Sequence, residues 1–422
     1  MSDCLVMLTK LFPFEKGEEF IENEVHMLAK AYDKIIIIAT STPDSPARTR
    51  IVPKNAEVFS IHASAIKRKL PFSALKLFPF TGFKDYCDKD EKLTIKHSLK
   101  RKAFLTYFIT KSQLVYQEAL KILARLEIDK YERVSLYSYW FYDTALAVAK
   151  LKGSLKAPAV KAVSRAHGYD LYPYRNTMNY LPLRSYILKQ IDAVYPCSEN
   201  GKNYLKEHYS LYSDKIQTAY LGTMDYGLAP QSGGEPFHIV SCCHISPVKR
   251  VELLAQALNV LKGSGLPLKW THFGGGEGLE ELQKFARDSL SFMECHFAGE
   301  IQNIELMEYY QKNPVDLFIN TSSSEGLPVS IMEACSFGIP TIATNVGGTG
   351  EIVLNGQTGI LLNADFNPEE LAEKIKSYLQ LPESLKNKFR QNCRTKWSND
   401  FNAIKNFTDF AEKIKPNKEA GN

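Results

Sequence analysis

The sequence contains no long hydrophobic run, no basic leader and no Cys-x-x-Cys pair, and each absence excludes a class of protein. Its longest strand-like aliphatic cluster, Ile35 to Ala39, is far shorter than the roughly 18 residues that a membrane-spanning helix needs. The segment Met1 to Leu5 has no basic residues ahead of an apolar stretch, so no signal peptide is expected. The eight cysteines are scattered, and we expect them to be reduced core thiols of a cytoplasmic protein rather than a disulfide framework or a zinc site.

The composition is that of an ordinary folded protein, with 44% hydrophobic and 23% charged residues in a chain of 422. This balance excludes a disordered, collagen-like or coiled-coil chain, and at roughly 150 residues per domain the length predicts two or three domains. Residues 1–225 hold 34 Lys and Arg against 24 Asp and Glu, whereas the remainder holds 18 against 23. The resulting net charges of +10 and −5 predict two domains with different partners, the basic one suited to nucleic acid, anionic lipid or a phosphorylated acceptor.

Apolar, β-branched runs alternate with helix-length stretches in both halves, which predicts two doubly wound α/β domains. The predicted strands are Cys4–Leu8, Lys34–Ala39, Ala56–Ile61, Arg133–Ser138, Val160–Ser164, Ala193–Pro196, Ile216–Tyr220, Phe237–Cys242, Leu268–Phe273, Glu294–Phe297, Asp316–Asn320, Thr341–Thr344 and Thr358–Leu362. The clearest predicted helices are Glu18–Ala31, Leu114–Leu126, Val251–Lys262 and Pro368–Gln380. The glycine- and proline-rich segment Gly227–Pro236 is the expected linker.

Residues 62–112 interrupt the alternation with a basic, phenylalanine-rich insertion. Residues 61–102 carry 11 basic and 4 acidic side chains. Cations interleaved with Phe rings suit contact with an anionic membrane, whereas the alternative is an insertion whose rings pack on its own domain. Pro71 and Pro79 argue against one continuous amphipathic helix, and both interpretations stay open.

The most specific motif follows the strand Asp316–Asn320 and contains two carboxylates, Glu325 in a loop and Glu333 in the second turn of a helix. Pro328 occupies the expected first helical position, so the backbone of Gly326, Leu327, Pro328 and Val329 lines a helix start that suits an anion. Carboxylates would repel phosphate, and their fitting partners are hydroxyls. A diphosphate on the helix start, ribose on Glu333 and a second polyol on Glu325 describe a nucleotide sugar; surface glutamates on an ordinary helix are the alternative.

The Glu-x7-Glu spacing with Gly326-Leu327-Pro328 resembles the signature of retaining glycosyltransferases of family GT4, which have the GT-B fold. The match continues through Gly338-Ile339-Pro340, Thr344 to Gly348 and Asn355 to Gly359, and weaker matches extend over essentially the whole chain. The resemblance implies two Rossmann-like domains facing across a cleft, with an acceptor domain at 1–226 and a nucleotide-sugar domain at 227–400. The terminal segment 401–422 follows, and a helix at Ser398–Lys415 is expected to cross back to the first domain.

Other matches to the family supply further donor contacts in the second domain. Lys249 resembles the lysine that holds the donor phosphate, where a fixed cation stabilises charge on the leaving diphosphate. The family usually has an arginine five residues earlier; this chain has His244, so either Arg250 supplies the charge or His244 supplies a hydrogen bond. Gly275 lies in a glycine turn similar to one that lines the nucleotide cleft, and Gly299 in a segment that approaches the base.

Two segments of the first domain resemble family motifs. The loop after the first strand, with Lys16 and Gly17, is similar to the glycine loop that closes over the donor diphosphate. His167 matches the family's histidine at the donor sugar, where its ring donates a hydrogen bond near the reacting carbon. Structural alternatives are an exposed loop lysine for Lys16 and a turn for His167-Gly168, while Arg165, Tyr169 and Asp170 either contact the acceptor or hold their loop.

The resemblance implies transfer with retention and without metal or cofactor, in which the departing phosphate takes the proton of the acceptor. Asp88-Lys89-Asp90 has the spacing of a metal-binding D-x-D motif, but it lies in the lysine-rich insertion and is expected to be a solvated turn. The chain has neither G-x-G-x-x-G nor a phosphate-binding G-x-x-x-x-G-K-[ST] loop.

The sequence therefore predicts a retaining glycosyltransferase of the GT4 type that moves a hexose from a nucleotide sugar, a UDP-sugar in preference to a GDP-sugar, to an acceptor glycan in surface polysaccharide assembly. A lipid-linked acceptor at the inner membrane face is expected, with a soluble acceptor as the alternative. A nucleotide-sugar epimerase and a non-catalytic sugar-nucleotide binder are the competing functions. No nucleic-acid partner is expected, because the basic half lacks a recognisable binding motif.

Overall fold

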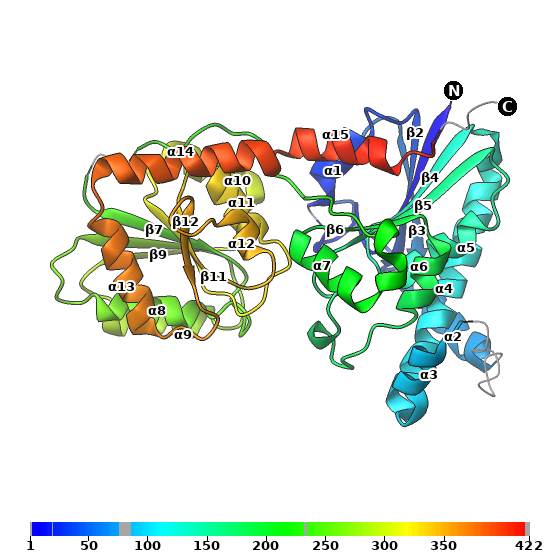
Figure 1. The fold of residues 1–422 in the computed structure, drawn as a ribbon, viewed down its shortest axis with the longest axis horizontal. Coiled ribbons are helices and arrows are strands. Elements are labelled where there is room, and N and C mark those ends of the chain that lie inside the picture. Colours follow the sequence, from blue (N-terminus) through cyan, green and yellow to red (C-terminus); the bar gives the residue numbers. More distant parts are fainter. Residues whose placement is uncertain (1, 19, 76–85, 232–233, 418–422) are drawn as a thin grey trace. The chain divides into compact units, whose positions relative to one another are not determined.

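The computed structural model describes residues 2–18, 20–75, 86–231 and 234–417, which form two α/β units (Figure 1). The first unit comprises Met1–Ala219 together with Ile404–Asn422, and the second comprises Tyr220–Ala403. Each unit contains a six-stranded sheet flanked by helices (Figure 1). In the described part of the chain, none of the helices combines the length and apolar character that a bilayer crossing requires.

The sheet of the first unit is entirely parallel, with strand order β3-β2-β1-β4-β5-β6. Its strands are β1 (Asp3–Thr9), β2 (Lys34–Thr42), β3 (Ala56–His62), β4 (Arg133–Ser138), β5 (Ala159–Ala166) and β6 (Ala193–Pro196). On β1, Cys4, Val6 and Leu8 pack into one hydrophobic core, whereas Leu5 and Met7 pack into a second core on the other face. Burial on both faces explains why these strands are continuous apolar runs.

Helices cover both faces of this sheet (Figure 1). They are α1 (Ile21–Leu28), α2 (Ala63–Leu75), α3 (Lys89–Lys96), α4 (Leu99–Arg125), α5 (Asp143–Lys152), α6 (Arg184–Gln190), α7 (Glu199–His208) and α15 (Ala403–Ile414), with short 3-10 turns at Ile128–Lys130, Pro173–Arg175 and Ser210–Lys215. The predicted insertion forms α2, α3 and the first half of α4, so it is not one continuous helix. Its segment 76–85, which includes Pro79, lies outside the described residues.

The sheet of the second unit is also parallel, with strand order β12-β11-β10-β7-β8-β9. Its strands are β7 (Phe237–Cys242), β8 (Leu268–Phe273), β9 (Glu294–Gly299), β10 (Leu317–Asn320), β11 (Thr341–Thr344) and β12 (Gly359–Leu362). Its helices are α8 (Val251–Val260), α9 (Leu279–Ser289), α10 (Asn303–Lys312), α11 (Val329–Ser336), α12 (Thr349–Ile352), α13 (Pro368–Leu379) and α14 (Glu383–Asp400). Counted from its own first strand, this order repeats that of the first unit.

Strand order reverses between β1 and β4 in the first unit and between β7 and β10 in the second. In doubly wound sheets of this kind, ligands bind beyond the carboxyl ends of the strands at such a switch point. The loops after β1, β4, β7 and β10 are therefore where a binding site is expected in each unit.

Three boundaries differ from the sequence prediction. The second unit begins at Tyr220 rather than near 227, because the Thr223 N–H donates to the Phe401 carbonyl and the Trp397 ring N–H donates to the Thr223 hydroxyl. The expected strand Ile216–Tyr220 reduces to one bridge, between Val194 and Ile216. The expected helix Ser398–Lys415 is broken between α14 and α15, and from Ile404 the chain again belongs to the first unit.

The eight cysteines, all within the described residues, form no disulfides; five of them are buried and three are half-buried. Burial raises the pKa of the Cys295 thiol to about 11 and that of Cys4 to about 12. Thiols with such pKa values are poor nucleophiles, so these side chains act as small core residues.

Candidate functional site

Lys249 and Glu325 meet at the switch point of the second unit. Lys249 follows β7 and Glu325 follows β10, and the Lys249 Nζ donates to Glu325 Oε1 at 2.7 Å. The Glu325 side chain is 9% exposed and that of Lys249 is 27% exposed. The two charged residues that the motifs predicted separately are thus direct partners.

The loop that carries Glu325 is fixed by contacts from several strands. The Asn320 amide donates weakly to Glu325 Oε1 at 3.4 Å, and the Ser323 N–H donates to the Val248 carbonyl at 2.8 Å. A Cβ at Gly347, whose φ is +55°, would lie 1.9 Å from the Glu325 carbonyl oxygen. Glycine at 347 therefore allows the loop after β11 to press against the Glu325 backbone.

Glu333 lies in the second turn of α11 with 7% of its surface exposed. Burial raises its pKa to about 7, while a hydrogen bond from the Asn303 amide at 2.7 Å works in the opposite direction. Helix α11 begins at Val329, one residue after the predicted start, and Pro328 immediately precedes it. The first N–H groups of an α-helix have no partner within the helix, so this start can accept an anion.

Arg250 and His244 separate into different roles. Arg250 has a left-handed backbone (φ +49°), and its guanidinium donates to the carbonyls of Thr321 at 2.8 Å and Ala364 at 2.7 Å. Arg250 thus braces the loops after β10 and β12. His244 is exposed in the loop after β7. A hydrogen bond from His244 to the donor, at the position where the family has its arginine, stays a prediction.

The predicted glycine turn packs against the loop that carries His244. A Cβ at Gly274 would lie 2.0 Å from the Cys243 carbonyl oxygen, and one at Gly276 would lie 2.3 Å from that of Ile245. Gly275, the residue predicted to line the site, tolerates a Cβ, which would meet Glu300 at 3.8 Å. Gly299, at the end of β9, has a φ of +68° and accepts a hydrogen bond from the Gly274 N–H.

In the first unit, one buried carboxylate holds the loop after β1. Glu18 accepts hydrogen bonds from the N–H groups of Lys10 at 3.1 Å, Leu11 at 2.6 Å and Phe12 at 2.6 Å. Glu18 also accepts a hydrogen bond from the ring N–H of Trp140. Because Trp140 follows β4, this bond links the loops after β1 and β4, the two strands of the switch point. The predicted helix Glu18–Ala31 is wrong at its start, because α1 begins only at Ile21 and Glu18 lies in the loop before it.

The predicted residues Lys16 and Gly17 lie in this same loop. Lys16 is exposed, and Gly17 has a φ of +116°, a backbone conformation that side chains other than glycine rarely adopt. The loop after β1 therefore has a fixed base at Glu18 and a glycine at its turn.

His167 follows β5 within a group of aromatic rings. Its ring stacks on Tyr139 with centroids 4.7 Å apart and lies 4.7 Å from the Trp140 ring. Asp170 accepts from the N–H groups of His167 at 2.7 Å and Phe141 at 2.8 Å, which fixes both loops. Within the described part of the chain, neither buried nitrogen of the His167 ring has a hydrogen-bond partner, although Nδ1 lies 3.7 Å from the Asp170 carboxylate.

Arg165 and Asp170, whose roles the sequence left open, hold the structure together. Arg165 is fully buried and lies 3.3 Å from Glu24 in an ion pair. Its guanidinium donates to the Ala219 carbonyl at 2.6 Å and lies 4.1 Å from the Phe410 ring centroid. Asp170 orders the loop beneath His167.

The predicted D-x-D mimic is the start of a helix. Asp88 caps α3 by accepting a hydrogen bond from the Glu91 N–H at 2.8 Å. The residues that the structure describes include no group of three or more His, Cys, Asp or Glu side chains placed to hold a metal ion.

Sequence reasoning did not find the roles of Glu18 and Asn303, and it placed Gly347 in a family motif without giving it a role of its own. Glu18 and Asn303 act through contacts with residues distant in the chain, which no local pattern reveals. Gly347 had a usable signal, because adjacent glycines after a buried strand indicate a close backbone approach.

Comparison with known proteins relates most of the second unit to a described family. Residues 229–396 match the family described as glycosyl transferases group 1. The O-antigen biosynthesis glycosyltransferase WbnH of Escherichia coli is 39% identical over 108 residues, which are 25% of this chain and 28% of that protein. The chain thus matches little more than a quarter of the length of that relative.

Two further proteins are similar over most of the chain. The uncharacterized glycosyltransferase MJ1178 of Methanocaldococcus jannaschii is 24% identical over 302 residues, 71% of this chain and 78% of that protein. The structure of Alr3699/HepE from Anabaena, in complex with UDP and glucose, is similar with a TM-score of 0.63 at 16% identity. That likeness covers 97% of this chain and 99% of the Anabaena chain, and it shows a shared fold.

Proposed function

We propose that the chain transfers a sugar from a nucleotide sugar to an acceptor hydroxyl, because residues 229–396 match the glycosyl transferases group 1 and the chain has the two-domain α/β GT-B fold. The observation that carries the proposal is the ion pair between Glu325 and Lys249, which lie on loops that meet at the β7/β10 switch point. Glu325 lies shortly before the start of α11. A cation and the N–H groups of a helix start suit the diphosphate of a nucleotide sugar, and the carboxylates suit its hydroxyls.

In the proposed donor complex, the diphosphate binds the start of α11 and Lys249, the ribose hydroxyls donate to Glu333, and the sugar hydroxyls donate to Glu325. Binding would replace the Lys249–Glu325 ion pair with one contact to phosphate and one to sugar. We propose a UDP-sugar with a hexose, because the similar Anabaena protein was solved with UDP and glucose.

For the chemical step we propose retention without a metal ion. As the glycosidic bond breaks, negative charge grows on the leaving diphosphate, and Lys249 and the α11 amides stabilise it. The departing phosphate takes the proton of the attacking hydroxyl on the same face of the sugar. His167, whose ring nitrogens make no hydrogen bond in the described structure, donates a hydrogen bond to the sugar.

For the acceptor we propose a lipid-linked glycan of surface polysaccharide assembly at the inner membrane face. The support is the match to an O-antigen glycosyltransferase and the surface of α3 and the start of α4. There Leu93 is 58% exposed and Leu99 is 79% exposed, among the exposed lysines 89, 92, 96 and 100. Apolar side chains surrounded by cations suit an anionic bilayer surface.

This function can be tested by thermal-shift measurements against UDP-, GDP- and ADP-sugars. A transfer assay with the best donor follows, in which the stereochemistry of the product is determined. We expect stabilisation by a UDP-sugar, an α-linked product from an α-linked donor, and turnover that survives EDTA. Stabilisation by none of the donors would contradict the proposal, and donor consumption without any acceptor would indicate an epimerase instead.

A further inference from the structure

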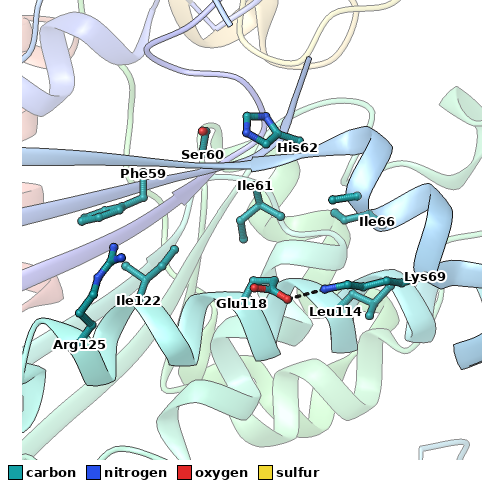
Figure 2. Close-up of a pocket in the computed structure, with 11 residues that line it drawn as sticks. Phe59, Ser60, Ile61, His62, Ile66, Lys69, Leu114, Glu118, Ile122 and Arg125 are labelled. Atoms are coloured by element: carbon teal, nitrogen blue, oxygen red, sulfur yellow. Dashed lines mark hydrogen bonds and ion pairs between the residues drawn. The ribbon is translucent and has the colours of Figure 1, made fainter. Parts of the chain in front are cut away.

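A cavity lies in the first unit, away from the loops described above. It has a volume of about 300 Å³ and lies between the edge strand β3, helix α2 and the second half of α4. Figure 2 shows Phe59 and Ile61 projecting from β3 toward Leu114 and Ile122 of α4. The cavity is within the size range of ligand pockets, which are predominantly apolar with a few polar groups.

The rim of this cavity is basic. Lys69 of α2 donates to Glu118 of α4 at 2.7 Å, and Lys121 donates to the same carboxylate oxygen at 3.1 Å. Arg125 lies at the other end, with its guanidinium 5.5 Å from the Phe59 ring centroid. Lys69 and Arg125 thus line the cavity together with one carboxylate, Glu118, while Lys121 lies outside the lining, so the charged side chains of the lining carry a net positive charge.

The cavity extends to the carboxyl end of β3, where Ser60 and His62 line it. Strand β2 separates β3 from β1, so the ends of β3 and β1 are about 10 Å apart across the sheet. The loop after β1 and the loop of His167 lie at this same edge, because all six strands are parallel. A molecule held in the cavity by one end can reach this edge with the other.

We propose that this cavity binds the hydrocarbon chain of a lipid phosphate, whose phosphate is held at the rim by Lys69. Resting on the function proposed above, this lipid phosphate is the carrier of the acceptor glycan. The apolar lining from Ile61, Leu114 and Ile122 takes the chain, and the basic rim takes the charge. This assignment explains why apolar and basic side chains are combined in the insertion that follows β3.

Calorimetric titration of the full chain with hexyl, octyl and dodecyl phosphate, each below its micellar concentration, tests the site. We expect one saturable site whose affinity rises about fourfold per methylene and then levels off when the cavity is full. Inorganic phosphate and octanol serve as the headgroup alone and the chain alone, and each should bind more weakly than octyl phosphate.

Three variants locate the site. Ala65→Phe fills the cavity from α2 and should weaken octyl phosphate binding at least tenfold, with folding checked by thermal denaturation. Lys69→Gln should weaken it about threefold, whereas Lys67→Gln, an exposed neighbour that does not line the cavity, should leave it unchanged. The two lysine variants are surface changes that keep the test decisive if Ala65→Phe does not fold.

Absence of saturable binding, affinity that rises without levelling off, or equal loss in both lysine variants would overturn the proposal. Titration of the wild-type chain with a UDP-sugar in parallel separates the two claims. Binding of the UDP-sugar without the alkyl phosphate refutes the lipid site alone, and the reverse result refutes the glycosyltransferase function alone.

Discussion

Glu333 is a buried carboxylate whose loss of hydration raises its pKa to about 7, from an ordinary value of 4.5. The folded protein therefore binds a proton at Glu333 more tightly than the unfolded chain does. The associated stability is fully present below pH 4.5 and is lost as the pH rises through 7. A ribose hydroxyl that donates to the ionised carboxylate would offset part of this cost.

Glu333→Gln should remove that pH dependence while keeping an oxygen acceptor for Asn303. We expect the variant to be more stable than the wild type by roughly 3 kcal/mol at pH 8 and about equal to it near pH 4.5. Chemical denaturation of both proteins at the two pH values measures the difference. Equal stability at pH 8 would show that Glu333 carries no buried charge.

Lys249→Met should leave the Glu325 carboxylate largely buried without its cation. We expect a loss of about 1–2 kcal/mol in the free energy of unfolding and roughly tenfold weaker donor binding. The double variant Lys249→Met/Glu325→Gln should regain stability, because no charge is then buried alone, but should not regain donor affinity. Recovery of affinity in the double variant would argue against a phosphate contact by Lys249.

At the residue scale, sequence reasoning located charges better than it located their partners. Glu325 and Glu333 stand out because of their spacing and the glycine that follows Glu325, whereas Lys249 was found only through the resemblance of its segment to the family. The Lys249–Glu325 ion pair joins residues 76 positions apart, and the Trp140–Glu18 bond joins residues 122 apart. Such contacts depend on strand order, which spacing along the chain does not reveal.

At the element scale, the donor loops are shaped by close backbone approaches. The loop after β11 presses on the loop of Glu325 at Gly347, and the glycine turn after β8 presses on the loop after β7 at Gly274 and Gly276. The Gly347 contact holds the backbone of Glu325, and the Gly274 and Gly276 contacts hold the loop after β7.

Gly347→Ala tests this arrangement against a matched control, Gly356→Ala. Both glycines have positive φ, +55° and +74°, but a Cβ at 347 meets the Glu325 carbonyl oxygen whereas one at 356 meets nothing within 4 Å. We expect Gly356→Ala to cost about 1 kcal/mol of stability with activity retained, and Gly347→Ala to cost clearly more and to abolish transfer. Similar activity in the two variants would contradict the role of the close approach.

Helices α3 and α4 carry the predicted membrane surface. The double variant Leu93→Glu/Leu99→Glu should reduce sedimentation with vesicles that contain anionic phospholipid by at least tenfold, because it removes apolar contacts and adds negative charge. Leu211→Glu, at a leucine that is 89% exposed outside the insertion, is the control and should bind like the wild type. Equal binding by all three proteins would place membrane contact elsewhere.

Helices and strands were predicted well where burial imposes a pattern of apolar residues on the sequence. They were predicted less well where a capping side chain decides at which residue a helix begins. The parallel strands were found because burial on both faces makes them continuous apolar runs. The helix Leu114–Leu126 is only the second half of α4, which begins at Leu99 because the Ser98 side chain caps it by accepting from the Arg101 N–H. The first half of α4 is rich in lysine, so its apolar residues do not show a clear helical periodicity in the sequence.

At the scale of the whole molecule, two units with the same strand order are joined at two places, between 219 and 220 and between 403 and 404. The second crossing returns α15 to the first unit, beside α1 (Figure 1), where Phe410, Ala411 and Ile414 complete the core behind β1 and β2. The sequence predicted two domains and a returning helix, but the crossings depend on contacts of Thr223 and Phe401 that only the fold brings together.

Phe410→Ala should therefore destabilise the first unit although it lies near the end of the chain. We expect a loss of about 3–5 kcal/mol, because the ring is buried and lies over the Arg165 guanidinium. Hydrogen exchange should quicken in β1 and β4 while β7 and β10 stay protected. Phe337→Ala, buried in the second unit, should produce the converse pattern, and loss of protection in both units for both variants would argue against separate cores.

Calorimetric titration of nucleoside diphosphates into the wild-type chain, Glu333→Gln and Lys249→Met tests the central claim most directly. Lys262→Met and Glu369→Gln, at exposed residues of the same unit, are the matched controls. We expect UDP to bind the wild type and both controls at one site with equal affinity, and to bind each site variant about tenfold more weakly. Failure of UDP, GDP and ADP to bind the wild type, or equal affinity in all five proteins, would contradict a donor site at the start of α11.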